Sequence, residues 1–353
     1  MIGVWTSRHP AAVVARAGLA PAALAYDLAR RGRAAAYRAG LRTRHRLPLP
    51  SVGVGSLQVG GAGKSPIASW IAGWFADRGV RPAILLRGYG GDEGPMHRTI
   101  EARALVVEDP DRRRGAARAV ADGAEVLVLD DQAQHLAVQV DHAFLLFGAA
   151  ALRGPRAVLP AGPWRQPWDD GAGDVLVLTV KQECDTGPAR ALLARAYPDR
   201  PLAEAVLAVG GWHHLGADAA HAEADPSGRT LLAVCGIADP DPFVAHARAV
   251  GAVPRVCVFR DHAAYGPRRV RRLVRAAESA RVDYVVTTAK DAVKLGPVWP
   301  ADAPPVLVAQ LAVRWVAGES DVTRVLDACL QASRARSATS PQRAAAASAA
   351  GTA

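Results

Sequence analysis

The chain has 353 residues, of which 50% are hydrophobic and 22% charged, and its formal net charge is +10. This is enough apolar sequence for the cores of one large or two ordinary domains. The four cysteines lack C-x-x-C spacing and the first residues lack the layout of a signal peptide, so we expect free thiols in a reducing compartment rather than a secreted disulfide scaffold.

The first 47 residues carry most of the excess charge. They contain nine arginines and one acid, Asp27, which gives +9 − 1 = +8. A basic block of this kind favours an anionic partner: a membrane surface, a nucleic acid or an acidic ligand. Residues 10–29 are apolar, but Arg16, Pro21 and Asp27 interrupt them, so they fall short of the roughly 20 uninterrupted apolar residues that cross a bilayer.

We therefore predict that residues 10–47 form an apolar and basic helix that lies at a membrane interface. Two alternatives stay open, namely a basic helix packed on the folded domain and a nucleic-acid-binding arm. The segment has little of the aromatic interleaving on which bases stack, which disfavours the arm.

From residue 51 short apolar runs alternate with helical stretches. The runs are mostly continuous, as in strands that are buried on both faces, and therefore predict a parallel sheet flanked by helices. The nine predicted strands cover residues 51–57, 83–86, 104–107, 126–129, 143–147, 175–179, 231–235, 284–288 and 306–311.

A glycine-rich loop follows the first of these strands. It reads "QVGGAGKSP" and supplies six candidate nucleotide-binding residues: Gly60, Gly61, Ala62, Gly63, Lys64 and Ser65. Glycines let backbone N–H groups converge on phosphate oxygens, a lysine bridges the β- and γ-phosphates, and a serine hydroxyl ligates Mg²⁺. The usual pattern has a glycine where this chain has Gln58. The next helix has one apolar face, starts near Pro66 and ends at Gly79.

Two acids, Asp130 and Asp131, end the strand at 126–129. Open α/β sheets place ligands at the carboxyl ends of their strands, and an acid at such a position commonly holds the metal in nucleotide-hydrolysing folds. We therefore predict an Mg²⁺ site formed by Ser65, Asp130 and Asp131, with Asp130 as the main ligand. The alternative is a pair of solvated turn acids.

These patterns predict an α/β fold with a P-loop NTPase-like parallel sheet, a second smaller α/β lobe and an N-terminal apolar helix. The irregular segment 159–173 is rich in Pro and Trp and is expected to join the two lobes. The predicted domains are a membrane-associating segment at 1–48, a P-loop domain at 49–165, a lobe that closes over the site at 166–333 and a low-complexity, disordered tail at 334–353.

Motifs in one order along the chain resemble those of the tetraacyldisaccharide 4′-kinases of lipid A synthesis. That family also lacks the early glycine of the loop, so Gln58 fits it. The matching segments are "VGGAGKSP" (59–66), "LRGYG" (86–90), "GDEG" (91–94), "DDQAQH" (130–135), "LPAGPWRQ" (159–166), "GIADPDPF" (236–243), "FRDHAAYG" (259–266) and "TAKDAVK" (288–294).

The resemblance implies ATP-dependent phosphorylation of the 4′-hydroxyl of a lipid-linked disaccharide 1-phosphate, with ATP and Mg²⁺ as cofactors. It implies that Asp92 is the catalytic acid–base and His262 its partner, because a carboxylate oriented by an imidazole can accept the proton of a sugar hydroxyl. Four further residues are candidates for contact with phosphate or substrate: Arg87, His135, Arg165 and Lys290.

The implied partners are an anionic glycolipid and, through residues 10–47, the cytoplasmic face of the bacterial inner membrane. We expect a monomer that binds no nucleic acid. A divergent relative that binds nucleotide as a regulatory or scaffold protein is the alternative, and a nucleic-acid-binding P-loop ATPase is less favoured because no helicase-like motif follows.

Three departures from the family pattern bear on activity. Gln132 and Ala133 replace a Gly-Leu pair, and glutamine would be strained if that glycine needs a positive φ. The connection between "RGYG" and "GDE" is nearly absent, so Asp92 follows Gly88 by only four residues. Ala263 replaces the second histidine of a D-H-H motif.

Overall fold

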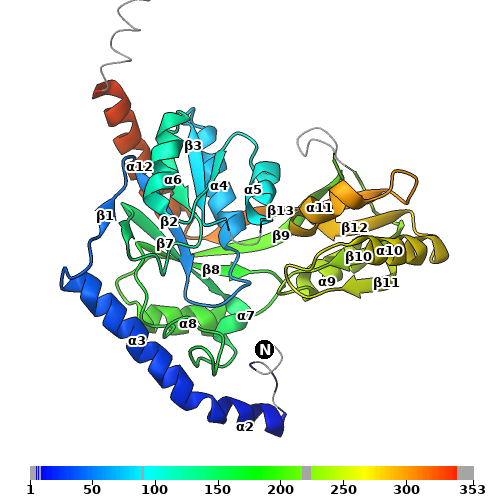
Figure 1. Cartoon of the computed structure of the whole chain (residues 1–353), viewed down its shortest axis with the longest axis horizontal. Coiled ribbons are helices and arrows are strands. Elements are labelled where there is room, and N and C mark those ends of the chain that lie inside the picture. Colours follow the sequence, from blue (N-terminus) through cyan, green and yellow to red (C-terminus); the bar gives the residue numbers. More distant parts are fainter. Residues whose placement is uncertain (1–4, 6, 8, 89–90, 217–223, 340–353) are drawn as a thin grey trace, which may run out of the picture.

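The computed structural model describes residue 5, residue 7 and residues 9–88, 91–216 and 224–339. A sheet of eleven strands runs through the molecule (Figure 1), and every pair of neighbours is parallel except β13 and β9. In spatial order the strands are β11 (Ala252–Val258), β10 (Thr230–Cys235), β12 (Tyr284–Thr288), β13 (Val306–Ala317), β9 (Leu202–His214), β8 (Val175–Val180), β7 (His142–Gly148), β2 (Ser51–Ser56), β5 (Val126–Leu129), β3 (Pro82–Leu86) and β4 (Leu105–Glu108).

All nine strands predicted from apolar runs are present, whereas β9 and β11 were not predicted. Strand β9 contains Gly210 and Gly211, and glycine pairs weaken the β pattern. In strand β11, Pro254 and Arg255 interrupt the apolar run, and proline is tolerated there because β11 is the edge of the sheet. A separate parallel pair, β1 (His45–Arg46) and β6 (Val138–Gln139), was also not predicted.

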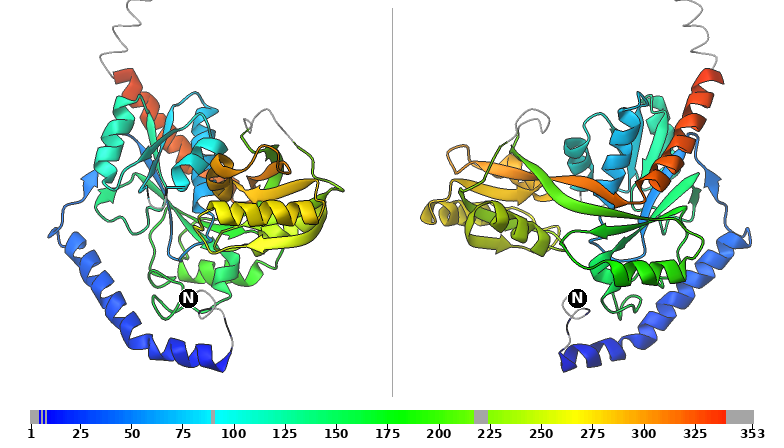
Figure 2. Two further views of the ribbon diagram at one scale, coloured as in Figure 1. Left: turned by 45° about the vertical axis from the view of Figure 1, so that its right-hand side comes forward. Right: turned by 180° about the vertical axis from the view of Figure 1, so that it is seen from behind.

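The molecule consists of two bodies, each with its own helices packed against its part of the sheet (Figure 2). The first body contains β2–β5, β7 and β8 with α4 (Lys64–Ala76), α5 (Glu93–Ile100), α6 (Arg112–Ala121), α7 (Ala149–Leu152), α8 (Gly187–Ala196) and α12 (Glu319–Thr339). The second body contains β10–β12 with α9 (Asp241–Val250), α10 (Pro267–Ser279), α11 (Ala289–Leu295) and the 3₁₀ turn η1 (Gly296–Val298). The long strands β9 and β13 run through both bodies, so one continuous sheet extends across them.

Helix α4 buries the apolar face that the sequence predicts. Ile67 and Ile71 are fully buried against β2, β3 and β5, and such a side chain contributes about 1.5–3 kcal/mol. Trp70 packs edge-on against Trp315 of β13, with ring centroids 5.1 Å apart. Gly79 takes a φ of 74° just after the helix, which only glycine adopts freely and which ends the helix as predicted.

The segment 159–173 packs into the first body instead of joining two lobes. Trp164 is fully buried, and its indole N–H donates to the carbonyl of Pro155 at 3.1 Å. Strands β7 and β8, which flank the segment in the chain, are hydrogen-bonded neighbours. The bodies are connected by β9 and β13.

Residues 334–339 were expected to belong to a disordered tail, but they are helical, because α12 continues to Thr339. Two serine hydroxyls of α12 hold this helix on the first body through Glu125: Ser333 donates to its carbonyl at 2.9 Å and Ser337 to its carboxylate at 3.3 Å. Residues 340–353 lie outside the described residues.

Two helices, α2 (Pro10–Gly18) and α3 (Ala20–Arg38), extend along one side of the first body (Figure 2). They bend by 45° at Leu19. Pro21 lies in the first turn of α3 and has no N–H to donate to the last turn of α2, so one continuous helix is disfavoured here. Among the described residues neither helix alone is long and apolar enough to cross a bilayer, although the bent pair together meets that criterion by length and composition. Large apolar side chains point away from the body: Val14 is 71% exposed, Leu24 62% and Leu28 59%.

Candidate active site

The glycine loop has the backbone that a phosphate-binding loop requires. Gly60, Gly61 and Gly63 all take φ between 66° and 75°. A methyl group on Gly63 would lie 2.2 Å from Cδ1 of Leu207, and the φ of 75° also disfavours residues other than glycine. The loop leaves β2 and enters the N-terminus of α4, where free N–H groups favour anions.

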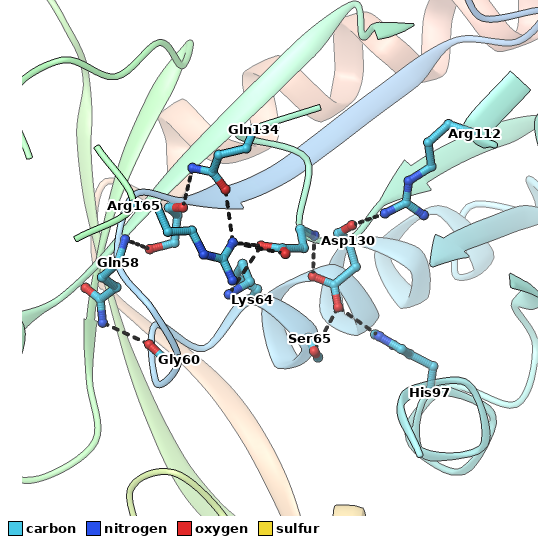
Figure 3. Close-up of polar contacts among 11 residues, drawn as sticks. Gln58, Gly60, Lys64, Ser65, His97, Arg112, Asp130, Gln134 and Arg165 are labelled. Carbon is cyan, nitrogen blue, oxygen red and sulfur yellow. Dashed lines mark hydrogen bonds and ion pairs between the residues drawn. The ribbon is translucent and has the colours of Figure 1, made fainter. Parts of the chain in front are cut away.

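Gln58 anchors this loop (Figure 3). Its amide nitrogen donates to the carbonyl of Gly60 at 3.2 Å, and its amide oxygen accepts from the N–H of Gly148 at 3.1 Å. The side chain is 5% exposed and ties the loop to the end of β7. Gln58 therefore has a structural role where the usual pattern has glycine.

Asp130 is a buried carboxylate at the end of β5 (Figure 3). Its Oδ2 accepts from the hydroxyl of Ser65 at 2.8 Å and contacts Nε2 of His97 at 3.1 Å, while Oδ1 accepts from the N–H of Asp131. Burial opposes its ionisation, but the hydrogen bond to His97 and the charge of Lys64 keep the pKa of Asp130 below its ordinary value. His97 is held in turn by Ser69, 2.8 Å from Nδ1.

The carboxylate of Asp131 lies beside two cationic side chains, those of Arg165 and Lys64. Nη1 of Arg165 donates to its Oδ1 at 2.7 Å, and Nζ of Lys64 lies 3.5 Å from the same oxygen. Arg165 also donates to Gln134 at 3.0 Å. Burial raises the pKa of Asp131, but the charges of Lys64 and Arg165 outweigh this effect and lower it overall.

Gln132 is not strained. The residue with positive φ is Asp131, at 55°, and aspartate tolerates this region. Gln132 is 7% exposed, donates from Nε2 to the carbonyl of His135 at 3.0 Å and packs against Gly53, while Ala133 packs against Gly55. The two glycines of β2 provide the space that Gln132 and Ala133 occupy.

Arg112 lies on the other side of Asp130. Its Nη2 donates to the carbonyl of Asp130 at 2.6 Å, while Nε and Nη1 are buried and have no hydrogen-bond partner among the described residues. The side chain is 3% exposed. Burial and the charge of Arg112 lower the pKa of the nearby His135 to about 4, so this imidazole is neutral at pH 7.

The second body brings His262 to Asp92, although 170 positions separate them. Nδ1 of His262 lies 3.0 Å from Oδ2 of Asp92, and Nζ of Lys294 lies 2.6 Å from the same oxygen. Asp92 is fully buried at the start of α5, and its Oδ1 has no hydrogen-bond partner among the described residues. Lys290 donates to Asp261 at 2.8 Å and approaches Nε2 of His262 at 3.2 Å.

One cavity of about 640 Å³ between the bodies connects these groups. Its lining contains most of the predicted site residues, whereas Asp92 lies buried next to His262. The predicted residues in the lining are Gly60, Gly61, Ala62, Gly63, Lys64, Ser65, Arg87, Asp130, Asp131, His135, Arg165, His262 and Lys290. Glu93 also lines it, and burial together with the charge of Asp130 raises the pKa of Glu93.

Several site residues were not predicted from the sequence: His97, Arg112, Gln134, Lys181 and Lys294. Lys181 and Lys294 could have been found by the rarity of lysine. The chain contains four lysines against 39 arginines, and all four lysines lie at this site. His97 and Arg112 had no such signal, since their roles depend on contacts with Asp130 that only the fold creates.

The oxygen donors at the glycine loop fit Mg²⁺. The hydroxyl of Ser65 and Oδ2 of Asp130 lie side by side, and the carboxylate of Asp131 follows in the chain. Hard oxygen ligands in small number are what Mg²⁺ prefers beside nucleotide phosphates. Within the described ranges no group of three or more His, Cys, Asp or Glu side chains forms a dedicated metal cage.

The glycine loop between a central strand and a helix, with paired acids on the neighbouring strand, defines a P-loop nucleotide-binding protein. The family model for tetraacyldisaccharide-1-P 4′-kinase matches residues 15–331, and the chain belongs to this family.

Curated relatives agree with this assignment. The chain is 38% identical over 305 residues to a tetraacyldisaccharide 4′-kinase from Methylobacterium sp., covering 82% of this chain and 86% of the relative. It is 35% identical to the enzyme of that name from Geobacter metallireducens, covering 79% and 88%. The fold resembles the structure of LpxK from Aquifex aeolicus in complex with ATP, with a TM-score of 0.66, 24% identity and coverage of 88% and 99%.

Proposed function

We propose that this protein transfers the γ-phosphoryl group of ATP to the 4′-hydroxyl of a tetraacyldisaccharide 1-phosphate, which gives the 1,4′-bisphosphate. One observation carries the proposal: the glycine loop and His262 line one cavity, and His262 contacts the buried Asp92, in a chain of the tetraacyldisaccharide-1-P 4′-kinase family. The regulatory alternative has less support, because Gln132 is unstrained and Ala263 leaves the pair intact.

The nucleotide end of the reaction uses the first body. N–H groups of the glycine loop and of the N-terminus of α4 would bind the phosphates of ATP, and Lys64 would balance the charge of the β- and γ-phosphates. Ser65, Asp130 and Asp131 would hold Mg²⁺, which when bound neutralises phosphate charge. His97 keeps Oδ2 of Asp130 directed at Ser65.

The acceptor end uses the pair formed across the two bodies. His262 lies on the cavity wall and Asp92 lies buried next to it, so the pair can take the proton of the 4′-hydroxyl as the new O–P bond forms. Lys294 shares Oδ2 of Asp92 with His262, which leaves Oδ1 free of protein hydrogen bonds. Arg87, Arg165, His135 and Lys290 surround the space where the phosphates and sugar would meet.

A transfer assay tests the proposal. Purified protein is incubated with Mg·ATP labelled at the γ-phosphate and with the disaccharide 1-phosphate in detergent micelles, and we expect labelled bisphosphate. Asp92→Asn should lower kcat at least about a hundredfold, the low end for loss of a general base, and leave the Kd for ATP within about twofold. Asp302→Asn, at an exposed acid of the β12–β13 connection, is the matched control.

The absence of product from the wild-type protein, in an assay where a curated relative works, would refute the kinase function. Loss of ATP affinity in Asp92→Asn would instead assign Asp92 to the nucleotide or the metal.

The helix pair α2–α3 supports a second part of the proposal, that the protein acts at the cytoplasmic face of the inner membrane. Outward-facing apolar side chains lie on a segment rich in arginine, and each basic residue near an anionic surface adds about 1 kcal/mol. We further propose that the protein acts as a monomer and binds no nucleic acid.

A further inference from the structure

Asp291 is a buried carboxylate behind the wall that the second body presents to the cavity. It is fully buried in the first turn of α11 and does not itself line the cavity. The nearby lysines of α11 are paired with other acids: Nζ of Lys290 with Asp261 at 2.8 Å and Nζ of Lys294 with Asp92 at 2.6 Å. Within the described part of the chain no ion pair joins Asp291 to a cation. A buried carboxylate is costly unless hydrogen bonds satisfy it, so its donors indicate its role.

Three segments of the second body donate hydrogen bonds to this carboxylate. The N–H of Gly236, just after β10, donates to Oδ2 at 2.9 Å, and the hydroxyl of Thr288, at the start of α11, donates to the same oxygen at 2.7 Å. The hydroxyl of Tyr265, after β11, donates to Oδ1 at 2.9 Å. Each segment also contributes to the cavity wall, through residues 237–239, 261–262 and 288–290. Asp291 therefore ties together three stretches of that wall.

The hydrogen bond from Tyr265 bears on His262, three residues earlier in the chain. Tyr265 is buried, and its ring packs edge-on against Phe259 with centroids 5.8 Å apart, so the two ends of the loop that carries His262 are joined. Burial and the charge of Asp291 raise the pKa of Tyr265, so its hydroxyl remains a donor at pH 7. His262 takes a φ of 59°, a left-handed conformation that a residue other than glycine keeps only where the surrounding structure imposes it.

The contacts of His262 define one orientation and one tautomer of its ring. Nδ1 lies 3.0 Å from Oδ2 of Asp92, and Nε2 lies 3.2 Å from Nζ of Lys290, an ammonium group that can only donate. Nε2 is therefore the acceptor, and Nδ1 carries the proton that the ring donates to Asp92. Both contacts depend on where the loop places the ring.

We propose that Asp291 is a positioning residue for the Asp92–His262 pair, because through Tyr265 it fixes the loop that carries His262. The consequence for phosphoryl transfer rests on the proposed function, whereas the orientation of the ring is a property of the folded protein alone. Asp291 lies outside the cavity lining, so it acts through these side chains and not on a substrate.

Two variants and a spectrum of the histidine ring test the proposal. Tyr265→Phe removes the hydroxyl and keeps the ring on Phe259, and Asp291→Ala removes the carboxylate. Protein with ¹⁵N-labelled histidine is studied by NMR at a pH that keeps the imidazole neutral, and the signal of His262 is assigned by its absence in His262→Gln. We expect the proton on Nδ1 in the wild type and a mixture of the two neutral tautomers in both variants.

The transfer assay supplies the second measurement. Tyr265→Phe should lower kcat by about tenfold to hundredfold, the range for misplacing a catalytic group by up to about 1 Å, and leave the Kd for ATP within about twofold. Tyr284→Phe is the matched control, because it removes a tyrosine hydroxyl from β12 of the same body that makes no contact with Asp291. Its ring signal and its kcat should equal those of the wild type.

A wild-type signal of His262 in Tyr265→Phe would overturn the proposal, and so would an altered signal with an unchanged kcat. The same altered signal in Tyr284→Phe would also overturn it, since the change would then reflect a general loosening of the second body. If Asp291→Ala does not fold, Tyr265→Phe alone is sufficient for the test. The spectra need no turnover, so a wild-type protein without transfer activity would refute the kinase function and leave the positioning of His262 open to measurement.

Discussion

Gln132 shows how a residue that departs from the family pattern is accommodated. Its side chain fills the space above Gly53, and its amide holds the turn that carries Asp131 and His135. The positive φ in this turn belongs to Asp131. The sequence analysis expected strain at Gln132 if that position needs a positive φ, and the structure shows no positive φ there.

This residue provides a test of strain. If Gln132 is unstrained and well packed, Gln132→Gly should lower the free energy of unfolding by about 1–3 kcal/mol, through the lost hydrogen bond, lost packing and greater freedom of the unfolded chain. Urea unfolding measures the change. A more stable glycine variant would show that glutamine is strained after all.

The residues of the site could be predicted from the sequence to different extents. The six residues of the glycine loop, Asp130 and His262 were predicted from short motifs, and all of them line one cavity. The partners of those residues were not predictable in the same way. Lys294 reaches Asp92 from α11, and His97 reaches Asp130 from α5, through contacts that depend on how helices pack.

At the scale of elements, the helix pair α2–α3 is held to the first body along one side only. The hydroxyl of Tyr26 donates to the carbonyl of Arg165 at 2.9 Å, and Arg30 pairs with Asp170 at 2.8 Å. Leu24 and Leu28, one turn apart, point away from the body. This asymmetry is what an interfacial helix requires.

Charged substitutions on that outer side should separate membrane binding from folding. Leu24→Asp with Leu28→Asp should lower partition onto anionic lipid vesicles by more than about tenfold, because each buried leucine is worth about 1.5–3 kcal/mol. Sedimentation with vesicles measures the loss.

The same variant should unfold at the wild-type urea concentration, since both side chains are exposed. Val120→Asp, on α6 and also exposed, is the control. Equal vesicle binding by all three proteins would show that the helix pair does not dock on membranes.

Among the elements, the fully buried strands were predictable because their apolar runs are continuous. Strand β11 was not, because an edge strand has water on one side and tolerates Pro254. The end of α12 was predicted too early, because "RARSAT" (334–339) has the composition of a polar tail. In the structure Ser333 and Ser337 hydrogen-bond Glu125 and hold the helix on the first body. Such side-chain anchors leave no pattern in sequence.

At the scale of the whole molecule, an ion pair crosses the cavity beside the glycine loop. Nζ of Lys181, after β8, lies 3.2 Å from Oδ2 of Asp239, between β10 and α9. The same Nζ lies 3.8 Å from where a Cβ of Gly61 would stand. Lys181 therefore adds positive charge at the phosphate site as well as linking the bodies.

If Lys181 supplies charge at the phosphate site, loss of Lys181 and loss of Asp239 should change ATP affinity in opposite directions. Lys181→Met should weaken ATP binding about fivefold, the equivalent of roughly 1 kcal/mol of charge interaction across water, and change stability by less than about 1 kcal/mol because the pair is partly exposed. Asp239→Asn should bind ATP as well as the wild type or more tightly. Isothermal titration measures both, and equal weakening in the two variants would favour a purely linking role.

The antiparallel β9–β13 pair has a consequence for synthesis on the ribosome. Strand β9 emerges before any residue of the second body, but its partner β13 emerges after all three strands of that body. Until then β9 is a bare sheet edge, the kind of surface on which chains join wrongly. We therefore expect the nascent chain to be open to misassembly at this edge between the translation of residues 214 and 306.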